Sequence, residues 1–302
     1  MLWVTALPFS NPFKEGCAMT RREFIMASTA VAIATQLRGS LQASESEAIR
    51  IGMCDWNLGK TGKIEALELA SKIGLDGVQV SILFPAPGKH LRDPEMQRRY
   101  LEVARKCNVA ICSTALGVLN GVPLKSEPKA ALWVADAIEV TRKLGCKVIL
   151  LAFFGKGTLH PNNEVEMKRV IDVLKELAPR AEKAGVILGL ENTLSAEDNM
   201  RIIDAVGSPA VRVYYDFKNS ANAGRDVPKE IRMLKDLICE VHIKNGNKFL
   251  SQRTNVDFPA CARALREIGY RGWYVLETSS PSGDLIADTR KNIEYVRKVF
   301  GA

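Results

Sequence analysis

Histidine is scarce in this sequence, and several common sequence signatures are missing from it. Among 302 residues there are three histidines, and none of the seven cysteines forms a Cys-x-x-Cys pair. Without such pairs, the usual structural zinc–cysteine sites are excluded. The turn after the first predicted strand also lacks the Gly-x-Gly-x-x-Gly pattern of a dinucleotide-binding fold. The chain therefore carries no marker of a zinc module or of a nucleotide-binding domain.

Basic charge is in excess, but it is spread along the chain. The formal net charge is +8. Residues 1–43 hold four basic and two acidic side chains, which leaves an excess of six over the rest. Those basic residues are distributed over predicted helices rather than clustered, as is typical of solvated helix faces. We therefore expect no nucleic-acid partner.

The first 43 residues combine paired arginines with a short apolar run. Arg21 and Arg22 precede an alanine-rich stretch, Met26 to Thr35, that is too short to span a bilayer but suits a signal peptide. A small residue, Ala43, lies before a plausible cleavage point. The segment resembles a twin-arginine export signal, and it predicts a periplasmic protein with no membrane span in its mature form. An amphipathic N-terminal helix is the alternative, and Met19 is an alternative start.

After residue 48, one pattern recurs eight times: a short strand-like run, a loop, and a segment with helical periodicity. The predicted strands are Ile51–Cys54, Gly77–Val80, Val109–Ser113, Val148–Ala152, Val186–Leu190, Val211–Tyr215, Cys239–Ile243 and Tyr274–Leu276. The predicted helices lie near 62–73, 93–107, 127–144, 163–184, 196–206, 228–236, 257–268 and 283–299. This alternation indicates parallel strands joined by right-handed crossovers. It predicts an α/β fold, a single (β/α)₈ TIM barrel over residues 49–302, rather than an open doubly wound sheet.

Four successive predicted strands end at side chains that can bind metal. They are Glu191, Asp216, His242 and Glu277, for strands five to eight. Chemistry in such barrels takes place at the C-terminal strand ends. Charged groups in apolar strands are costly unless paired or metal-bound, and no basic residue takes a matching position, which disfavours the alternative of a buried ion-pair network. Three carboxylates and one imidazole suit one divalent ion, with Mn²⁺ expected first and Mg²⁺, Co²⁺ or Zn²⁺ as alternatives.

With these residues the chain resembles the xylose isomerase-like barrels, the sugar phosphate isomerases and epimerases, and in particular the ketose 3-epimerases. The resemblance covers nearly all of residues 49–302 and is most specific over Tyr215–Ile231 and Val241–Lys244. It implies a carbohydrate substrate and one metal ion held by the four strand-end residues. It also implies that Glu191 and Glu277 serve as acid and base.

Elementary chemistry agrees with this implication. A metal that polarises a carbonyl stabilises the enediolate formed when a neighbouring C–H proton is removed. Two carboxylates on opposite sides of a sugar can take a proton from one face and return one to the other. Glu191 and Glu277 come from strands on either side of Asp216 and His242, so they are the predicted pair of an isomerase or epimerase. The same chemistry would serve a lyase or dehydratase that expels a β-substituent.

Five further residues are candidate substrate contacts: Trp56, His160, Glu197, Asn219 and Lys248. Glu197 and Lys248 each lie six residues after a predicted ligand, where the ketose 3-epimerases carry a glutamate and an arginine, although both also suit exposed charges. Asn219 stands where those enzymes carry a second histidine, a departure that leaves the substrate open. Trp56 could stack on a sugar face or pack at the rim, and His160 lies in the loop after the fourth strand.

The other functions considered fit the sequence less well. The abasic-site endonucleases of the same superfamily need many histidines for a three-zinc cluster, and this chain has three in all. A sugar-binding protein of the hinge type needs two lobes, and no such division is visible. No glycine-rich phosphate cradle is present, which favours an unphosphorylated sugar. The sequence leaves room for a homo-oligomer.

Overall fold

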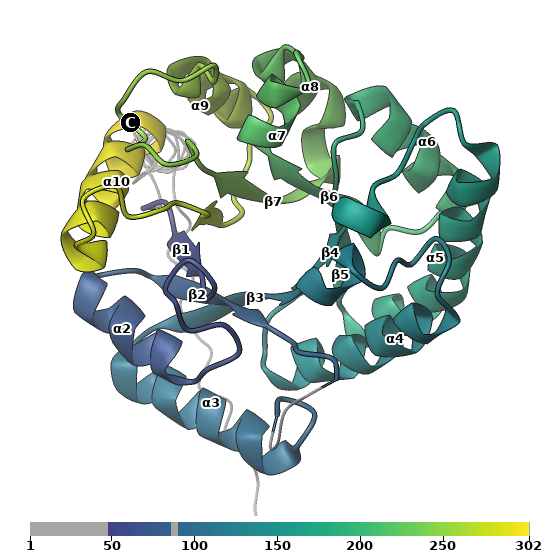
Figure 1. The fold of residues 1–302 in the computed structure, drawn as a ribbon, viewed down its shortest axis with the longest axis horizontal. Helices are drawn as coiled ribbons and strands as arrows, with labels where there is room; N and C mark the ends of the chain where they lie inside the picture. The colour runs from purple at the N-terminus through teal and green to yellow at the C-terminus, as the bar shows by residue number, and fades with distance from the viewer. Residues whose placement is uncertain (1–47, 86–89, 302) are drawn as a thin grey trace, which may run out of the picture. The chain divides into compact units, whose positions relative to one another are not determined.

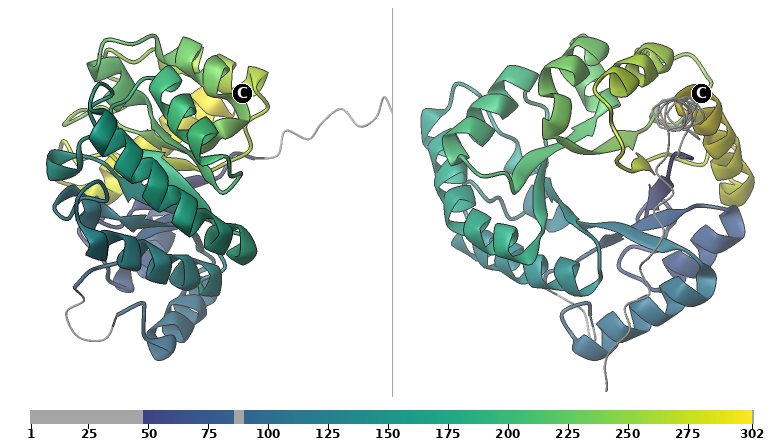
Figure 2. Two further views of the ribbon diagram at one scale, coloured as in Figure 1. Left: turned by 90° about the vertical axis from the view of Figure 1, so that its right-hand side faces the viewer. Right: turned by 180° about the vertical axis from the view of Figure 1, so that it is seen from behind.

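A computed structural model describes residues 48–85 and 90–301. Eight parallel strands close into a barrel in the order β1-β2-β3-β4-β5-β6-β7-β8, with helices around the outside (Figures 1 and 2). Residues from Ala48 onward form one compact unit. The predicted TIM barrel is confirmed, and the predicted signal segment, residues 1–43, lies outside the described residues.

The elements follow the predicted order closely. The strands are β1 Ile51–Cys54, β2 Gly77–Ser81, β3 Ala110–Leu116, β4 Val148–Ala152, β5 Ile187–Glu191, β6 Val211–Asp216, β7 Ile238–Ile243 and β8 Tyr274–Leu276. The helices are α2 Glu65–Ile73, α3 Pro94–Cys107, α4 Pro128–Lys143, α5 Glu164–Ala184, α6 Ala196–Val206, α7 Phe217–Asn222, α8 Val227–Leu234, α9 Phe258–Glu267 and α10 Leu285–Phe300. Short 3₁₀ turns occur at Gly117–Asn120, Gly155–Gly157 and Lys235–Leu237. Two differences matter for the site: β5 and β6 each extend to include the acidic residue at their end, and α7 was not predicted.

Capping side chains mark where most of the outer helices begin. Seven caps accept a hydrogen bond from a backbone N–H two or three residues further on, namely Asp93, Asn163, Ser195, Asp216, Asp226, Asp257 and Asp284. Gly185 and Gly207 end α5 and α6 at φ 66° and 71°, a left-handed conformation that glycine adopts without strain. These caps and glycines set where the helices begin and end around the barrel.

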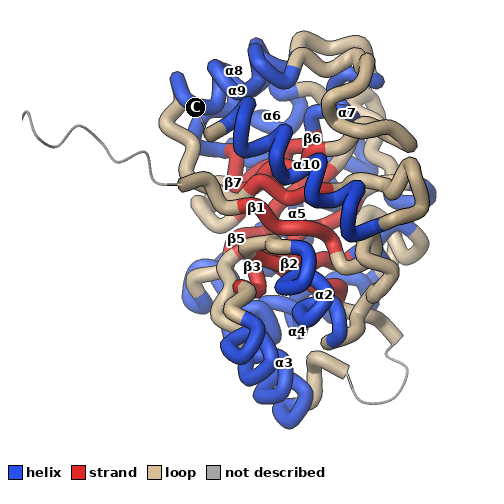
Figure 3. The backbone as a smooth tube through the Cα atoms, turned by 90° about the vertical axis from the view of Figure 1, so that its left-hand side faces the viewer, coloured by secondary structure: helices blue, strands red, loops and turns tan. Residues whose placement is uncertain are grey.

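Side chains alternate along each strand between two separate cores. On β4, Val148 and Leu150 point into the barrel, whereas Ile149 and Leu151 belong to the larger core between the barrel and its helices. Figure 3 shows the strands enclosed by that outer layer of helices. The inner core is small, and its other members are Cys54, Cys112, Ala115, Ala152, Tyr214 and Val275. Polar side chains on the inward-facing positions therefore share a confined space at the barrel axis.

Two further features concern the described residues alone. All six of their cysteines are free thiols. No helix in residues 48–85 or 90–301 is both long and apolar enough to cross a membrane.

Candidate metal centre

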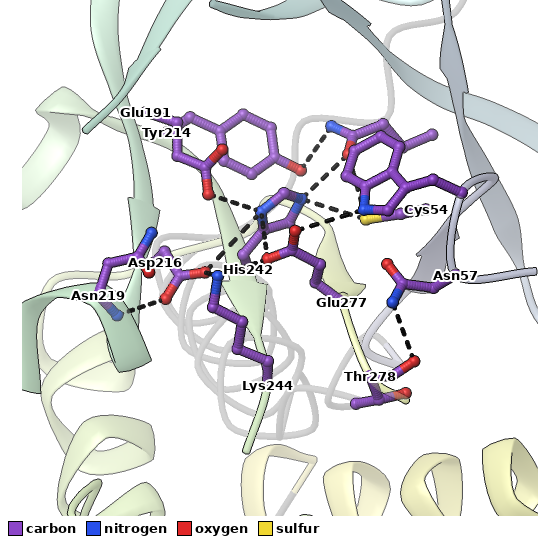
Figure 4. A network of polar contacts seen from close by, with 12 residues as sticks. Cys54, Asn57, Glu191, Tyr214, Asp216, Asn219, His242, Lys244, Glu277 and Thr278 are labelled. Carbon is purple, nitrogen blue, oxygen red and sulfur yellow. Dashed lines mark hydrogen bonds and ion pairs between the residues drawn. The ribbon is translucent and has the colours of Figure 1, made fainter. Parts of the chain in front are cut away.

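The four predicted metal ligands meet at the C-terminal end of the barrel. Glu191 ends β5, Asp216 ends β6, His242 lies on β7, and Glu277 directly follows β8. One donor atom from each lies within 4.8 Å of the other three (Figure 4). Residues up to 86 positions apart in the chain are thus brought into one cluster of three carboxylates and one imidazole.

Strand alternation and register explain why these side chains converge. Asp216 and His242 are direct neighbours in the register of β6 and β7. The outward positions beside them are filled by apolar residues such as Tyr215 and Val241, which belong to the core under the helices. Because alternate residues face opposite sides of a strand, the ligands must point to the barrel axis. The closed barrel leaves no other direction for them.

The imidazole is the centre of this cluster. His242 is fully buried, and its Nδ1 atom lies 2.9 Å from Glu191 Oε1, 3.7 Å from Glu277 Oε2 and 4.0 Å from Asp216 Oδ2. Nδ1 is therefore the nitrogen that could bind a cation together with the carboxylates. Its ring edge also meets Tyr214, at a centroid separation of 4.6 Å.

The carboxylate of Asp216 accepts a hydrogen bond at only one of its two oxygens. Its Oδ1 accepts the backbone N–H of Asn219 at 2.7 Å and so caps α7. Its Oδ2 is buried and has no hydrogen-bond partner among the described residues. A buried acceptor without a donor, next to two more carboxylates and an imidazole nitrogen, is what a divalent cation would satisfy. The residues present therefore fit such an ion, held by Glu191, Asp216, His242 and Glu277.

Burial and mutual charge shift the ionisation of the cluster. Burial raises the pKa of Asp216 to about 6, against the opposing effect of a nearby lysine, and the two neighbouring glutamates add to the rise. Burial lowers the pKa of His242, but Glu191 and the other carboxylates outweigh it, so the net shift is upward. For Glu277, burial raises the pKa and the cations around it outweigh this, so the net shift is downward. The site therefore favours a bound positive charge at its centre.

A polar column beneath the cluster orients His242. The Oε1 atom of Gln79 lies 3.0 Å from His242 Nε2 and accepts the thiol proton of Cys54 at 3.3 Å. The Nε2 amide of Gln79 donates to Ser113 Oγ at 3.1 Å and to Tyr214 OH at 3.0 Å. A carboxamide oxygen can only accept, so His242 Nε2 must carry a proton. Removing the Nδ1 proton then leaves a lone pair aimed at the carboxylates, as metal ligation requires.

Glu240 lies at the lower end of this column. It is two residues before His242 on β7 and only 2% exposed. Burial raises its pKa to about 8, although hydrogen bonding to Ser113 and Tyr214 opposes the rise. Its Oε2 atom has no hydrogen-bond partner among the described residues. Glu240 is thus a buried acid that accepts hydrogen bonds from the hydroxyl groups of Ser113 and Tyr214. With their protons directed toward Glu240, the oxygens of these two hydroxyls can accept the N–H bonds of Gln79.

One basic side chain reaches the cluster. Lys244, directly after β7, places its Nζ atom 2.6 Å from Glu277 Oε2 and 3.0 Å from Asp216 Oδ2. No basic residue takes a position matching the four ligands, as the sequence indicated, but Lys244 still forms ion pairs with two of them. The strands were compared only at the ligand positions, and Lys244 lies two residues further on, at the next inward-facing position.

The candidate substrate contacts divide into two groups. The indole Nε1 of Trp56 donates to Glu277 Oε1 at 3.3 Å, and Asn219 holds Asp216 through its backbone while its own side-chain Nδ2 has no partner among the described residues. These two belong to the site. The side chains of His160, Glu197 and Lys248 are exposed, and the structure gives none of them a contact with the four ligands. Their proposed substrate contacts stay predictions.

Residues 67–299 match the sequence profile of the xylose isomerase-like TIM barrel family. The chain belongs to this family. An Escherichia coli L-ribulose-5-phosphate 3-epimerase is 27% identical over 256 residues, which cover 78% of this chain and 88% of the relative. A 2-epi-5-epi-valiolone 7-phosphate 2-epimerase from an Actinoplanes species is 26% identical over 199 residues, covering 65% of this chain and 73% of the relative.

Solved structures confirm the same fold. An L-ribulose 3-epimerase superposes with a TM-score of 0.70 at 22% identity, over 84% of this chain and 95% of the other. A 3-keto-D-glucoside 4-epimerase from E. coli superposes with a TM-score of 0.66 at 18% identity, over 83% and 99%. The expected xylose isomerase-like barrel is therefore confirmed.

Removing the acceptor for His242 should weaken metal binding without unfolding the barrel. Gln79→Leu keeps the size of the side chain but leaves His242 Nε2 without its partner, so the imidazole is no longer held in the required tautomer. We expect divalent-ion affinity to fall by about 10–100-fold, measured by calorimetric titration. Thr114→Val is the control, because it removes a buried hydroxyl that contacts Thr141 at 2.7 Å on the outer face of β3. Equal losses in both variants would contradict an orienting role for Gln79.

Glu240 should make the protein less stable as the pH rises. The folded protein retains this proton up to about pH 8, whereas the unfolded chain releases it near 4.5, so alkali favours unfolding between these values. The slope is at most about 1.4 kcal/mol per pH unit. Relative to the wild type, Glu240→Gln should therefore gain stability between about pH 5 and pH 8 in urea denaturation. A difference that does not change with pH would show that Glu240 is ionised in both states.

Proposed function

We propose that this protein is a metal-dependent isomerase or epimerase that acts on a sugar or keto-sugar through an enediolate. The observation that carries the proposal is the placement of two carboxylates, Glu191 and Glu277, at the two ends of a four-strand row with Asp216 and His242 between them. The epimerases among its relatives support the reaction class. The same relatives act on phosphorylated compounds by name, so free and phosphorylated sugars both need testing.

The chain's own groups are arranged to move a proton. When bound, the metal ion would polarise the substrate carbonyl and stabilise the negative charge that develops on its oxygen. Glu277 Oε1 accepts a hydrogen bond from the indole of Trp56, and the positive charge around Glu277 lowers its pKa, which favours the carboxylate form that accepts a proton. Glu191 is oriented by His242. One glutamate removes the proton next to the carbonyl and the other returns a proton, with the direction set by the substrate.

Mn²⁺ is the ion that we propose for the site. Three carboxylates and one imidazole offer hard oxygen donors with a single nitrogen, and Mn²⁺ accepts both. Mg²⁺, Co²⁺ and Zn²⁺ are the alternatives. Metal content and the activity of each reconstituted form would rank them.

The acid–base pair can be tested by substitution in heavy water. Glu191→Gln and Glu277→Gln keep the size of each side chain, so folding should survive while turnover falls by about 10²–10⁴-fold. A panel of free and phosphorylated ketoses and keto-glycosides with Mn²⁺ should give products that lose no part of the substrate and differ in mass only by the deuterium taken up at the carbon next to the carbonyl. Glu166→Gln is the control, because Glu166 also pairs with a lysine, Lys125, at 2.9 Å but touches none of the four ligands.

Three outcomes would contradict this function. Wild-type turnover in both glutamine variants would remove the two-carboxylate mechanism. Loss of water or of an aglycone would indicate the lyase or dehydratase instead. Conversion without any deuterium uptake, in either glutamine variant or in the wild type, would indicate that no proton is exchanged with solvent.

We also propose that residues 1–43 direct export to the periplasm, on the strength of the paired arginines and the apolar run that follows them. Protein recovered from its native host should begin near Ser44 when its N-terminus is sequenced. An intact Met1 in a cytoplasmic fraction would contradict the proposal.

A further inference from the structure

Lys244 enters the centre from the strand that carries the histidine ligand. It follows β7 directly, two residues after His242, so alternation directs its side chain toward the same axis. Its side chain is 21% exposed. Figure 4 shows the lysine side chain ending between Asp216 and Glu277.

The ammonium contacts the oxygens that face the imidazole. Lys244 Nζ lies 2.6 Å from Glu277 Oε2 and 3.0 Å from Asp216 Oδ2. The same two oxygens are those through which Glu277 and Asp216 approach His242 Nδ1, at 3.7 Å and 4.0 Å. Lys244 and a cation bound at Nδ1 would therefore use the same pair of carboxylate oxygens.

The two contacts of Lys244 differ in kind. The ammonium donates a hydrogen bond to Glu277 Oε2, whereas Asp216 Oδ2 has no hydrogen-bond partner despite the short distance. Lys244 thus neutralises Asp216 by charge alone. Among the described residues it is also the only lysine or arginine within ion-pair distance of the four ligands. Three carboxylates gathered around one buried imidazole depend on this single side chain for additional positive charge.

A divalent cation and an ammonium repel each other when they share ligands. Metal–oxygen bonds to carboxylates are about 2.0–2.6 Å long, so an ion on the two oxygens would lie within a few ångströms of Nζ. The flexible four-carbon stem of lysine lets the ammonium move, which a histidine or arginine would do less readily. Burial disfavours the charge on Lys244, but the carboxylates outweigh this and raise its pKa.

We propose that Lys244 is a built-in competitor of the metal ion: its ammonium holds Asp216 and Glu277 together when the protein is stripped of metal, and it must leave these oxygens when the ion binds. This inference rests on the metal site of the proposed function. Metal loading is then an exchange of one cation for another. The carboxylates stay neutralised in both states, at the cost of a weaker affinity for the ion.

Lys244→Met tests the competition, because methionine keeps much of the side-chain length and removes the charge. In chelator-stripped protein titrated with Mn²⁺, the variant should bind the ion roughly tenfold more tightly than the wild type or better. Its Tm without metal should fall by about 2–4 °C, whereas its Tm at saturating Mn²⁺ should change little. Lys244→Arg, which keeps the charge, should retain the weaker binding and serves if the methionine variant folds poorly.

Lys125→Met is the matched control. Lys125 is a largely buried lysine that bonds to Glu166 at 2.9 Å and to the carbonyl of Thr158 at 2.8 Å, away from the four ligands. The Lys125→Met variant should have a Tm that is lowered by the same amount with and without Mn²⁺, and its affinity for the ion should be unchanged.

The possible failures are distinguishable. Unchanged or weaker Mn²⁺ binding in Lys244→Met would overturn the competition alone, because it would make Lys244 a residue that organises the ligands. If the wild type and Lys244→Met both bind no divalent ion, the competition and the metal part of the proposed function fall together. If His242→Ala still binds the ion as the wild type does, the metal site lies elsewhere and both fall as well.

Discussion

The crowding of three carboxylates around one buried imidazole is the constraint on which the rest of this centre depends. Like charges at such distances in a buried site are unfavourable unless cations and donors surround them. The barrel supplies these from several strands: the imidazole from β7, the ammonium just beyond it, and the indole of Trp56 after β1. Each compensating group also fixes the position of the carboxylate that it touches.

The orientation of the imidazole depends in turn on the interior of the barrel. Many TIM barrels fill this space with branched apolar side chains. Here the middle layer contains an amide, two hydroxyls and a carboxyl, and the amide of Gln79 links the two hydroxyls to His242 through hydrogen bonds. A polar layer at this depth is expensive to bury, and its hydrogen bonds restrict the ring above it to one orientation.

Particular residues show how much of the fold and of the site could be predicted from the sequence. The cluster of Glu191, Asp216, His242 and Glu277 was predictable because each is an ionisable side chain at the end of an apolar run. Lys244 and Gln79 were not, because a lysine after a strand and a glutamine within one are ordinary, and only the closed barrel brings Gln79 beneath a histidine 163 positions away. The helix α7 was missed because its six residues show no helical periodicity, and its start depends on the cap supplied by Asp216.

That cap also limits how the aspartate can bind a cation. One oxygen of Asp216 is committed to the backbone N–H of Asn219, so only the other, which accepts no hydrogen bond, is left for a cation. The residue is therefore restricted to monodentate coordination by the start of the helix that follows it. If the other three residues also contributed one atom each, the protein would hold a cation through four atoms and leave the rest of its coordination to substrate or water.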